Sequence, residues 1–107
     1  RNHLFIDDFI RILEKLIILD SHGTLNIANN KAHSFVEIVH EISKISNKET
    51  RLRFIDRNKP VAHKKIDISK MKSLVTDFEF TPISVGLCKT YSFFHSEYLK
   101  GTPLARN

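Results

Sequence analysis

Six histidines and one cysteine are the residues of this chain best suited to hold a metal or act as nucleophiles. The histidines are His3, His22, His33, His40, His63 and His95. None of them forms the i, i+4 pair or the Cys/His cluster that a zinc site requires, so we expect structural or surface roles for all six. Cys88 falls in a predicted helix, which favours a small buried hydrophobic residue over a reactive thiolate. The sequence therefore predicts no metal site and no catalytic residue.

Cofactor binding is limited by the small number of glycines. The chain has three, at Gly23, Gly86 and Gly101. A dinucleotide fingerprint or a phosphate loop needs glycines clustered where a strand turns into a helix. Neither pattern can be placed in the chain, so we expect these residues alone to bind no NAD or NADP.

Positive charge is the most promising feature for ligand binding. Seventeen Lys and Arg against 12 Asp and Glu give a net charge of +5, which favours phosphate-bearing partners. The densest basic stretch covers residues 57–65, and its simplest interpretation is a solvated loop. Arg57 stands out there because a guanidinium can bind a diphosphate through two parallel hydrogen bonds, which lysine cannot do.

The elements that must position these groups follow from apolar periodicity. Steps of three and four predict a helix that begins at Ile6 and stops by residues 21–23, since glycine is the usual exit residue. Asp7 and Asp8 lie at its start, where carboxylates can cap free backbone N–H groups. The stripe expected to face the core contains Ile6, Phe9, Ile10, Leu13, Leu16 and Ile17.

Three further helices are predicted in the same way. Ser34 and Glu37 form a capping box that opens the second, and Asp67 can cap a short third. The fourth covers about residues 84–98. Their expected buried residues are Phe35, Ile38, Val39, Ile42 and Ile45 in the second, Ile68, Met71 and Leu74 in the third, and Leu87, Tyr91, Phe94 and Tyr98 in the fourth.

Alternating residues predict extended segments between the helices. Residues 24–28 alternate like a strand and end in a turn at Asn29 and Asn30. Residues 51–54 place Leu52 and Phe54 on an apolar face and two arginines on the other. Residues 77–80 are also expected to be extended. We therefore predict an α+β fold, in which a small sheet is covered by about four helices.

Length and composition predict one domain in a reducing compartment. A chain of 107 residues can bury one core, and we assign residues 1–100 to a single lobe and residues 101–107 to a disordered tail. The lone Cys88 has no partner for an intramolecular disulfide. The longest aliphatic run, at residues 16–19, is far shorter than the roughly 18 residues of a membrane span, and no leader pattern opens the chain. We expect a cytoplasmic protein, cut from a longer polypeptide at Arg1.

Several segments also form an ordered series of motifs. Residues 1–8 (RNHLFIDD) resemble R-D-F-V-Y-V-D-D, residues 23–27 (GTLNI) resemble G-x-Y-N-I-G, and residues 34–38 (SFVEI) resemble S-x-x-E-L. Residues 67–70 match D-x-S-K, ten residues after Arg57, which takes the place of Arg in R-P-G-D. Residues 80–82 and 86–91 resemble W-x-P and E-G-L-x-x-T-x-x-W-Y. In this order, the motifs resemble the C-terminal part of extended short-chain dehydrogenases/reductases, the NAD(P)-dependent nucleotide-sugar epimerases, dehydratases and reductases.

The resemblance implies the substrate-binding lobe of a Rossmann-type α/β enzyme, which folds over a nucleotide-sugar. NAD or NADP would be held by an N-terminal Rossmann domain of the same polypeptide, and the parent enzyme could be a homodimer. By position, Arg57 and Arg1 correspond to arginines that approach the nucleotide diphosphate, whereas Asp7, Asp8 and Asp67 correspond to structural residues.

The chain also departs from the family pattern. Asn29 replaces the usual glycine after the strand, and Asn58 replaces the proline after Arg57. The catalytic Tyr-x-x-x-Lys is absent, because His95 and Thr102 stand four residues after the two tyrosines. The resemblance therefore implies binding of the nucleotide-sugar without catalysis by this chain alone.

Two alternatives remain open. The basic charge is compatible with a small nucleic-acid-binding module, although Phe54 is the only aromatic residue near the basic stretch and no nucleic-acid-binding motif is visible. The other alternative is an interaction domain that binds no ligand.

Overall fold

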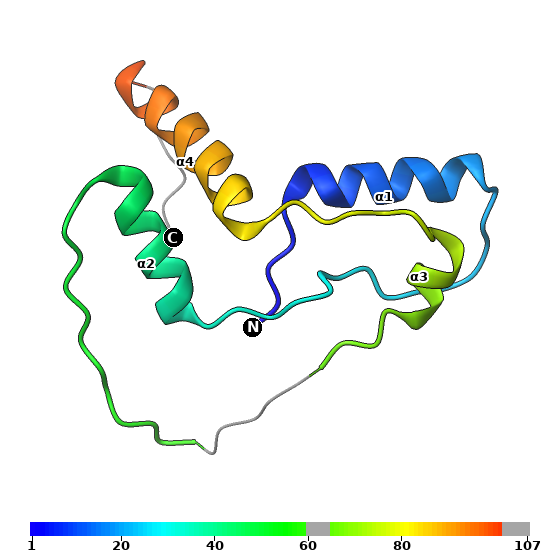
Figure 1. Cartoon of the computed structure of the whole chain (residues 1–107), viewed down its shortest axis with the longest axis horizontal. Helices are drawn as coiled ribbons and strands as arrows, with labels where there is room; N and C mark the ends of the chain where they lie inside the picture. Colours follow the sequence, from blue (N-terminus) through cyan, green and yellow to red (C-terminus); the bar gives the residue numbers. More distant parts are fainter. Residues whose placement is uncertain (60–64, 102–107) are drawn as a thin grey trace. The chain divides into compact units, whose positions relative to one another are not determined.

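The computed structural model of the chain describes residues 1–59 and 65–101. Four helices occur in that part: α1 (Ile6–Ile18), α2 (Phe35–Ser46), α3 (Ser69–Leu74) and α4 (Ile83–Leu99) (Figure 1). The chain divides into two compact units. Unit 1 combines Arg1–Ser34 with Leu52–Thr81, and unit 2 combines Phe35–Arg51 with Pro82–Asn107.

All four predicted helices are confirmed, but the predicted α+β class is wrong. Within residues 1–59 and 65–101 the fold is all-α, and the β-type pairing found there is a single antiparallel bridge between Asn2 and Ala32. The segment at residues 24–28 is held by side chains rather than by a neighbouring strand. Lys70 Nζ donates to the Thr24 carbonyl over 2.8 Å, and the Asn26 amide donates to the Asp67 carbonyl over 3.1 Å. The strands predicted at residues 24–28 and 51–54 are therefore wrong, because no second backbone among the described residues pairs with them in a ladder.

The end of α1 differs from the prediction because a non-glycine residue closes the helix. Asp20 adopts the left-handed conformation with φ of 52°. Its N–H bonds the Ile17 carbonyl, and the Ser21 N–H bonds the Leu16 carbonyl over 3.1 Å, which together form a Schellman motif. Gly23, with φ of +100°, lies in the following loop and not at the helix exit.

The face that α1 buries is not the predicted one. Its buried residues are Asp8, Ile12 and Leu16. The predicted stripe is mostly exposed, since only Leu16 of its six members is buried. The exposed members are Ile6, Ile10, Leu13 and Ile17. The apolar arc of α1 is therefore wider than the surface that unit 1 covers.

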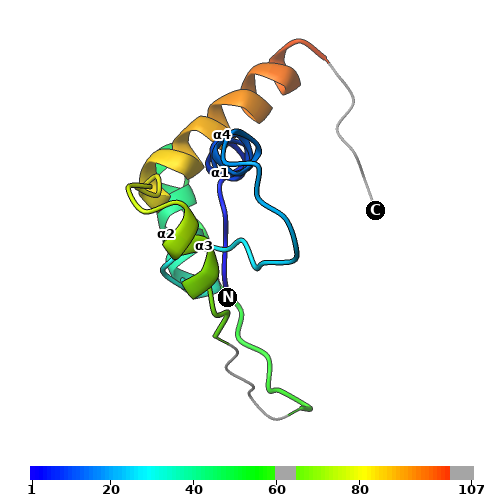
Figure 2. The ribbon, with the colours of Figure 1, turned by 90° about the vertical axis from the view of Figure 1, so that its right-hand side faces the viewer.

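The core of unit 1 forms where α1 and α3 meet two segments that lie outside the helices, residues 24–28 and residues 75–80. Its buried apolar residues are Ile12, Leu16, Ala28, Ile68, Met71 and Val75. Leu25, Ile27, Phe78 and Phe80 pack partly buried against them. In Figure 1 the segment that follows α3 runs alongside α1, and Figure 2 views α1 nearly end-on. Two of the three residues predicted to be buried around α3, Ile68 and Met71, are confirmed, whereas Leu74 is exposed.

Unit 2 is built mainly from α2 and α4, which contact each other. None of the residues of α2 is buried, and α4 buries only Gly86. The stripes predicted for both helices are half-buried or exposed, with Phe35 and Tyr98 exposed by 56% and 69%. Gly101 follows α4 in a left-handed conformation, and the rest of the predicted tail lies outside the described residues. No described helix has both the length and the apolar character needed to cross a membrane.

Candidate functional site

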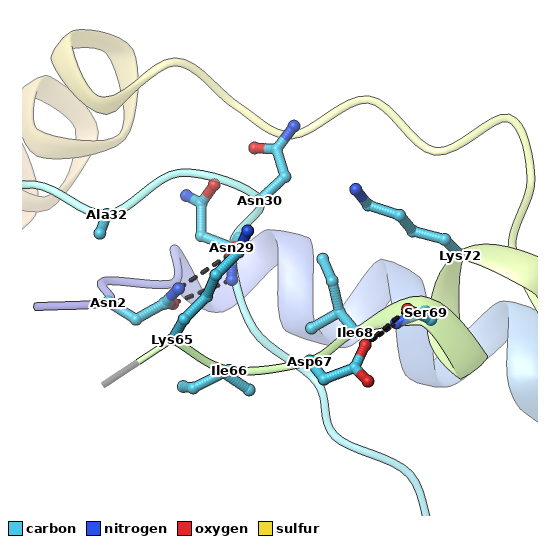
Figure 3. Close-up of a pocket in the computed structure, with 10 residues that line it drawn as sticks. All are labelled: Asn2, Asn29, Asn30, Ala32, Lys65, Ile66, Asp67, Ile68, Ser69 and Lys72. Atoms are coloured by element: carbon cyan, nitrogen blue, oxygen red, sulfur yellow. Dashed lines mark hydrogen bonds between the residues drawn. The ribbon is translucent and has the colours of Figure 1, made fainter. Parts of the chain in front are cut away.

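A polar cavity of about 580 Å³ lies in unit 1. Its size falls within the roughly 300–1,000 Å³ typical of small-molecule sites. It is lined by Asn2, Asn29, Asn30, Ala32, Lys65, Ile66, Asp67, Ile68, Ser69 and Lys72 (Figure 3). Three chain segments and α3 contribute to it, so residues far apart in the sequence share one concave surface.

The Asn2 and Asn29 side chains build one wall of this cavity. The Asn2 amide donates to the Asn29 carbonyl over 2.8 Å, and its oxygen accepts from the Asn29 N–H over 2.9 Å. The Asn29 amide in turn donates to the His3 carbonyl over 3.1 Å, and its oxygen accepts from the Lys31 N–H. The side chains of Asn2 and Asn29 therefore link the backbone of residues 1–3 to that of residues 29–31 through hydrogen bonds. Sequence reasoning placed Asn29 and Asn30 in a turn, which did not indicate this role.

Two lysines bring positive charge to the cavity. Lys65 extends toward Asn29, and Lys72 enters from α3 (Figure 3). Neither side chain has a hydrogen bond or a short ion pair within residues 1–59 and 65–101. Asn30 has no hydrogen-bond partner there either. Two ammonium groups and a carboxamide are thus available to a ligand with anionic and hydroxyl oxygens.

The carboxylate of Asp67 is already engaged at the edge of the cavity. It accepts the Ser69 N–H over 2.9 Å and the Ser69 hydroxyl over 2.5 Å. These two bonds, helped by the charge of Lys65, lower the pKa of Asp67 below its ordinary value of 3.8. Ile68, not Asp67, occupies the N-cap position of α3 and no side-chain capping bond is formed there, so Asp67 bonds Ser69 from one residue before the N-cap and its predicted place as the cap is wrong.

Asp8 has a structural role outside the cavity. It is fully buried, and its carboxylate accepts the Thr81 N–H over 2.9 Å and the Thr81 hydroxyl over 2.6 Å. Arg11 pairs with the same carboxylate over 3.3 Å and lies 4.7 Å from the centre of the Phe78 ring. We expected Asp8 to cap α1, but its bonds tie α1 to the segment before α4 instead. Phe5 occupies the N-cap position and makes no side-chain capping bond.

The two arginines predicted to bind a diphosphate do not line the cavity. Arg57 is exposed at the end of an open segment and has no partner among the described residues. The N-terminal ammonium of Arg1 donates to the His33 carbonyl over 3.0 Å. Their assignment to the diphosphate stays a prediction.

The other predicted residues add no second site. Ser34 and Glu37 lie at the start of α2 as expected, and Asp7 lies in the first turn of α1. Cys88 is exposed, so the prediction that it is buried is wrong. Among residues 1–59 and 65–101, no three His, Cys, Asp or Glu side chains gather as a metal site would require.

No protein-family model, curated protein or solved structure matches this chain.

The three glycines of the chain are dispersed and do not cluster at one turn. Gly23 lies in a loop, Gly86 lies within α4, and Gly101 follows that helix. None of them stands where a strand turns into a helix, which is the turn that cradles a pyrophosphate. The cavity of unit 1 is the candidate binding site.

Proposed function

We propose that this chain binds a nucleoside-diphosphate sugar in the cavity of unit 1 and acts as the substrate-binding part of a longer NAD(P)-dependent epimerase, dehydratase or reductase. One observation carries the proposal. Lys65 and Lys72 bring two ammonium groups to the same cavity as the carboxamide of Asn30, and none of the three has a hydrogen bond within residues 1–59 and 65–101. Ammonium groups favour phosphate oxygens, and a carboxamide can donate to and accept from sugar hydroxyls.

The motif resemblance supports the same ligand class. Its D-x-S-K segment, residues 67–70, supplies Asp67 and Ser69 to the cavity wall, and its first segment supplies Asn2. The resemblance places Arg57 and Arg1 near the diphosphate, and Arg1 directly precedes Asn2, which lines the cavity. Since the catalytic Tyr-x-x-x-Lys is absent, catalysis would need residues from outside these 107.

Calorimetric titration of the 107-residue chain with a panel of nucleoside-diphosphate sugars tests this proposal. Lys65→Ala and Lys72→Ala should each weaken binding by about ten-fold, as loss of a charge-assisted contact predicts. Lys59→Ala is the matched control, because Lys59 is an exposed cation of the same basic stretch that does not line the cavity. Arg57→Ala tests the arginine assignment in the same assay. Equal losses in all the lysine variants, or no saturable binding, would contradict the proposal.

The nucleic-acid alternative predicts a different result in a parallel experiment. Affinity for duplex DNA would fall log-linearly with salt, and each lysine variant would lower it by a similar amount. An interaction domain without a ligand would bind neither the nucleotide-sugars nor the DNA.

A further inference from the structure

The segment at residues 52–57 of unit 1 has the properties of an unpaired β-strand. It has no regular secondary structure, and all six residues are exposed, with Phe54 at 80% and Ile55 at 77%. None of its backbone N–H or C=O groups has a partner within the described part of the chain. Water satisfies these groups in the free chain, so they remain available for pairing with another strand.

The side chains of this segment divide between two faces. Successive residues of a paired strand point to opposite sides, so Arg53, Ile55 and Arg57 would share one face. Leu52, Phe54 and Asp56 would share the other. One face is thus an apolar residue flanked by two cations, and the other is two apolar residues followed by one carboxylate.

We propose that residues 52–57 dock by β-augmentation onto the edge strand of a partner protein whose own sheet presents acidic residues opposite the two arginines. Main-chain hydrogen bonds would supply affinity, and the alternating side chains would select the partner. The chain contributes the added strand, and the sheet belongs to the partner. This inference uses neither the cavity nor its lysines, so it stands apart from the proposed function.

Charge excludes a second copy of the chain as the preferred partner. A symmetric antiparallel pairing centred on Phe54 sets Arg57 opposite Arg51, and one centred on Ile55 sets Arg57 opposite Arg53. Like charges directly opposite each other destabilise a strand pair. A partner strand with the order acidic, apolar, acidic on the matching face removes this repulsion, and the net charge of +5 further favours an acidic partner.

Two labelled peptides provide the test on the 107-residue chain. The first is Thr-Glu-Val-Val-Ile-Glu-Thr, blocked at both ends, and the second carries Lys in place of both Glu residues. Fluorescence anisotropy should show at least about ten-fold tighter binding of the acidic peptide. Amide hydrogen exchange should slow at residues 52–57 when it binds.

Variants make the inference falsifiable. Ile55→Pro removes a ladder N–H at a position that is 77% exposed and should abolish binding. Arg53→Glu leaves one cation and one carboxylate on the binding face and should remove the preference between the peptides. Lys48→Glu makes a charge change of the same size outside the segment and should keep the preference. Equal binding of both peptides, or protection elsewhere in the chain, would overturn the proposal. A poly-dT oligonucleotide that binds instead, and is lost in Phe54→Ala, would overturn it in favour of a nucleic-acid partner.

Discussion

Helix α1 of unit 1 and helix α2 of unit 2 are both clearly amphipathic but bury very different parts of their apolar faces. Every large buried side chain of the described residues lies in unit 1, including Ile12 and Met71 at 0% and 1% exposure. In unit 2, α2 buries no residue and α4 buries only Gly86. In unit 1, α3 and the segments at residues 24–28 and 75–80 pack around α1. Unit 2 consists mainly of two helices. Amphipathic periodicity thus forms a helix in either place, but a core requires additional elements to enclose its apolar face.

The largest expected effect compares the same substitution in the two units. Ile12→Ala should lower the free energy of unfolding by roughly 2–5 kcal/mol, because it leaves a cavity in the core of unit 1. Ile42→Ala is the matched change in unit 2, where the side chain is 39% exposed, and should cost about 1 kcal/mol or less. Urea denaturation followed by circular dichroism measures both. Equal losses would show that the two units do not differ in packing.

The second prediction concerns the polar part of unit 1. Asp8→Ala should cost roughly 2–4 kcal/mol, since it leaves the N–H and the hydroxyl of Thr81 without their acceptor. Asp7→Ala, one residue earlier and exposed, should change stability by less than about 0.5 kcal/mol. The same urea assay applies. If Asp8→Ala were as mild as its neighbour, the link between α1 and Thr81 would not contribute to stability.

The smallest expected effect lies at the start of α3. Because the pKa of Asp67 is lowered on folding, its stabilising contribution is full above the ordinary value of 3.8. That contribution is lost as pH falls through the lower pKa of the folded chain, which is below about pH 4. Ser69→Ala removes the hydroxyl donor, whose hydrogen bond is the largest cause of the lowered pKa. The Asp67 pKa should therefore rise toward its ordinary value.

An NMR titration of the Asp67 carboxyl group measures this pKa. Ser73→Ala is the control, because the Ser73 hydroxyl donates to the Lys70 carbonyl and not to Asp67. An unchanged Asp67 pKa in Ser69→Ala would mean that the Ser69 hydroxyl does not stabilise the carboxylate.

Local signals in the sequence were sufficient for the helices. Apolar spacing predicted α1 to α4, and Asp67 was identified beside the start of α3, where it accepts the Ser69 N–H although Ile68 takes the N-cap position. Both features depend on residues within one or two helical turns. The cavity depended on long-range contacts, since Asn2 meets Asn29 and Lys65 lies with Lys72 on the same surface. Nothing in the spacing of these residues indicated that they would converge.

By itself, the sequence determined where helices form, because helix formation depends on side-chain periodicity and local backbone preference. Only the tertiary structure decided which face of α1 is buried and that Asp8 bonds Thr81. It also decided that residues 24–28 are held by side-chain bonds, whereas residues 52–57 have no backbone partner among the described residues. These outcomes depend on contacts such as that between Lys70 and Thr24, 46 residues apart in the chain. A periodic pattern specifies a face of an element, but the neighbour that covers this face is set by the packing of the whole unit.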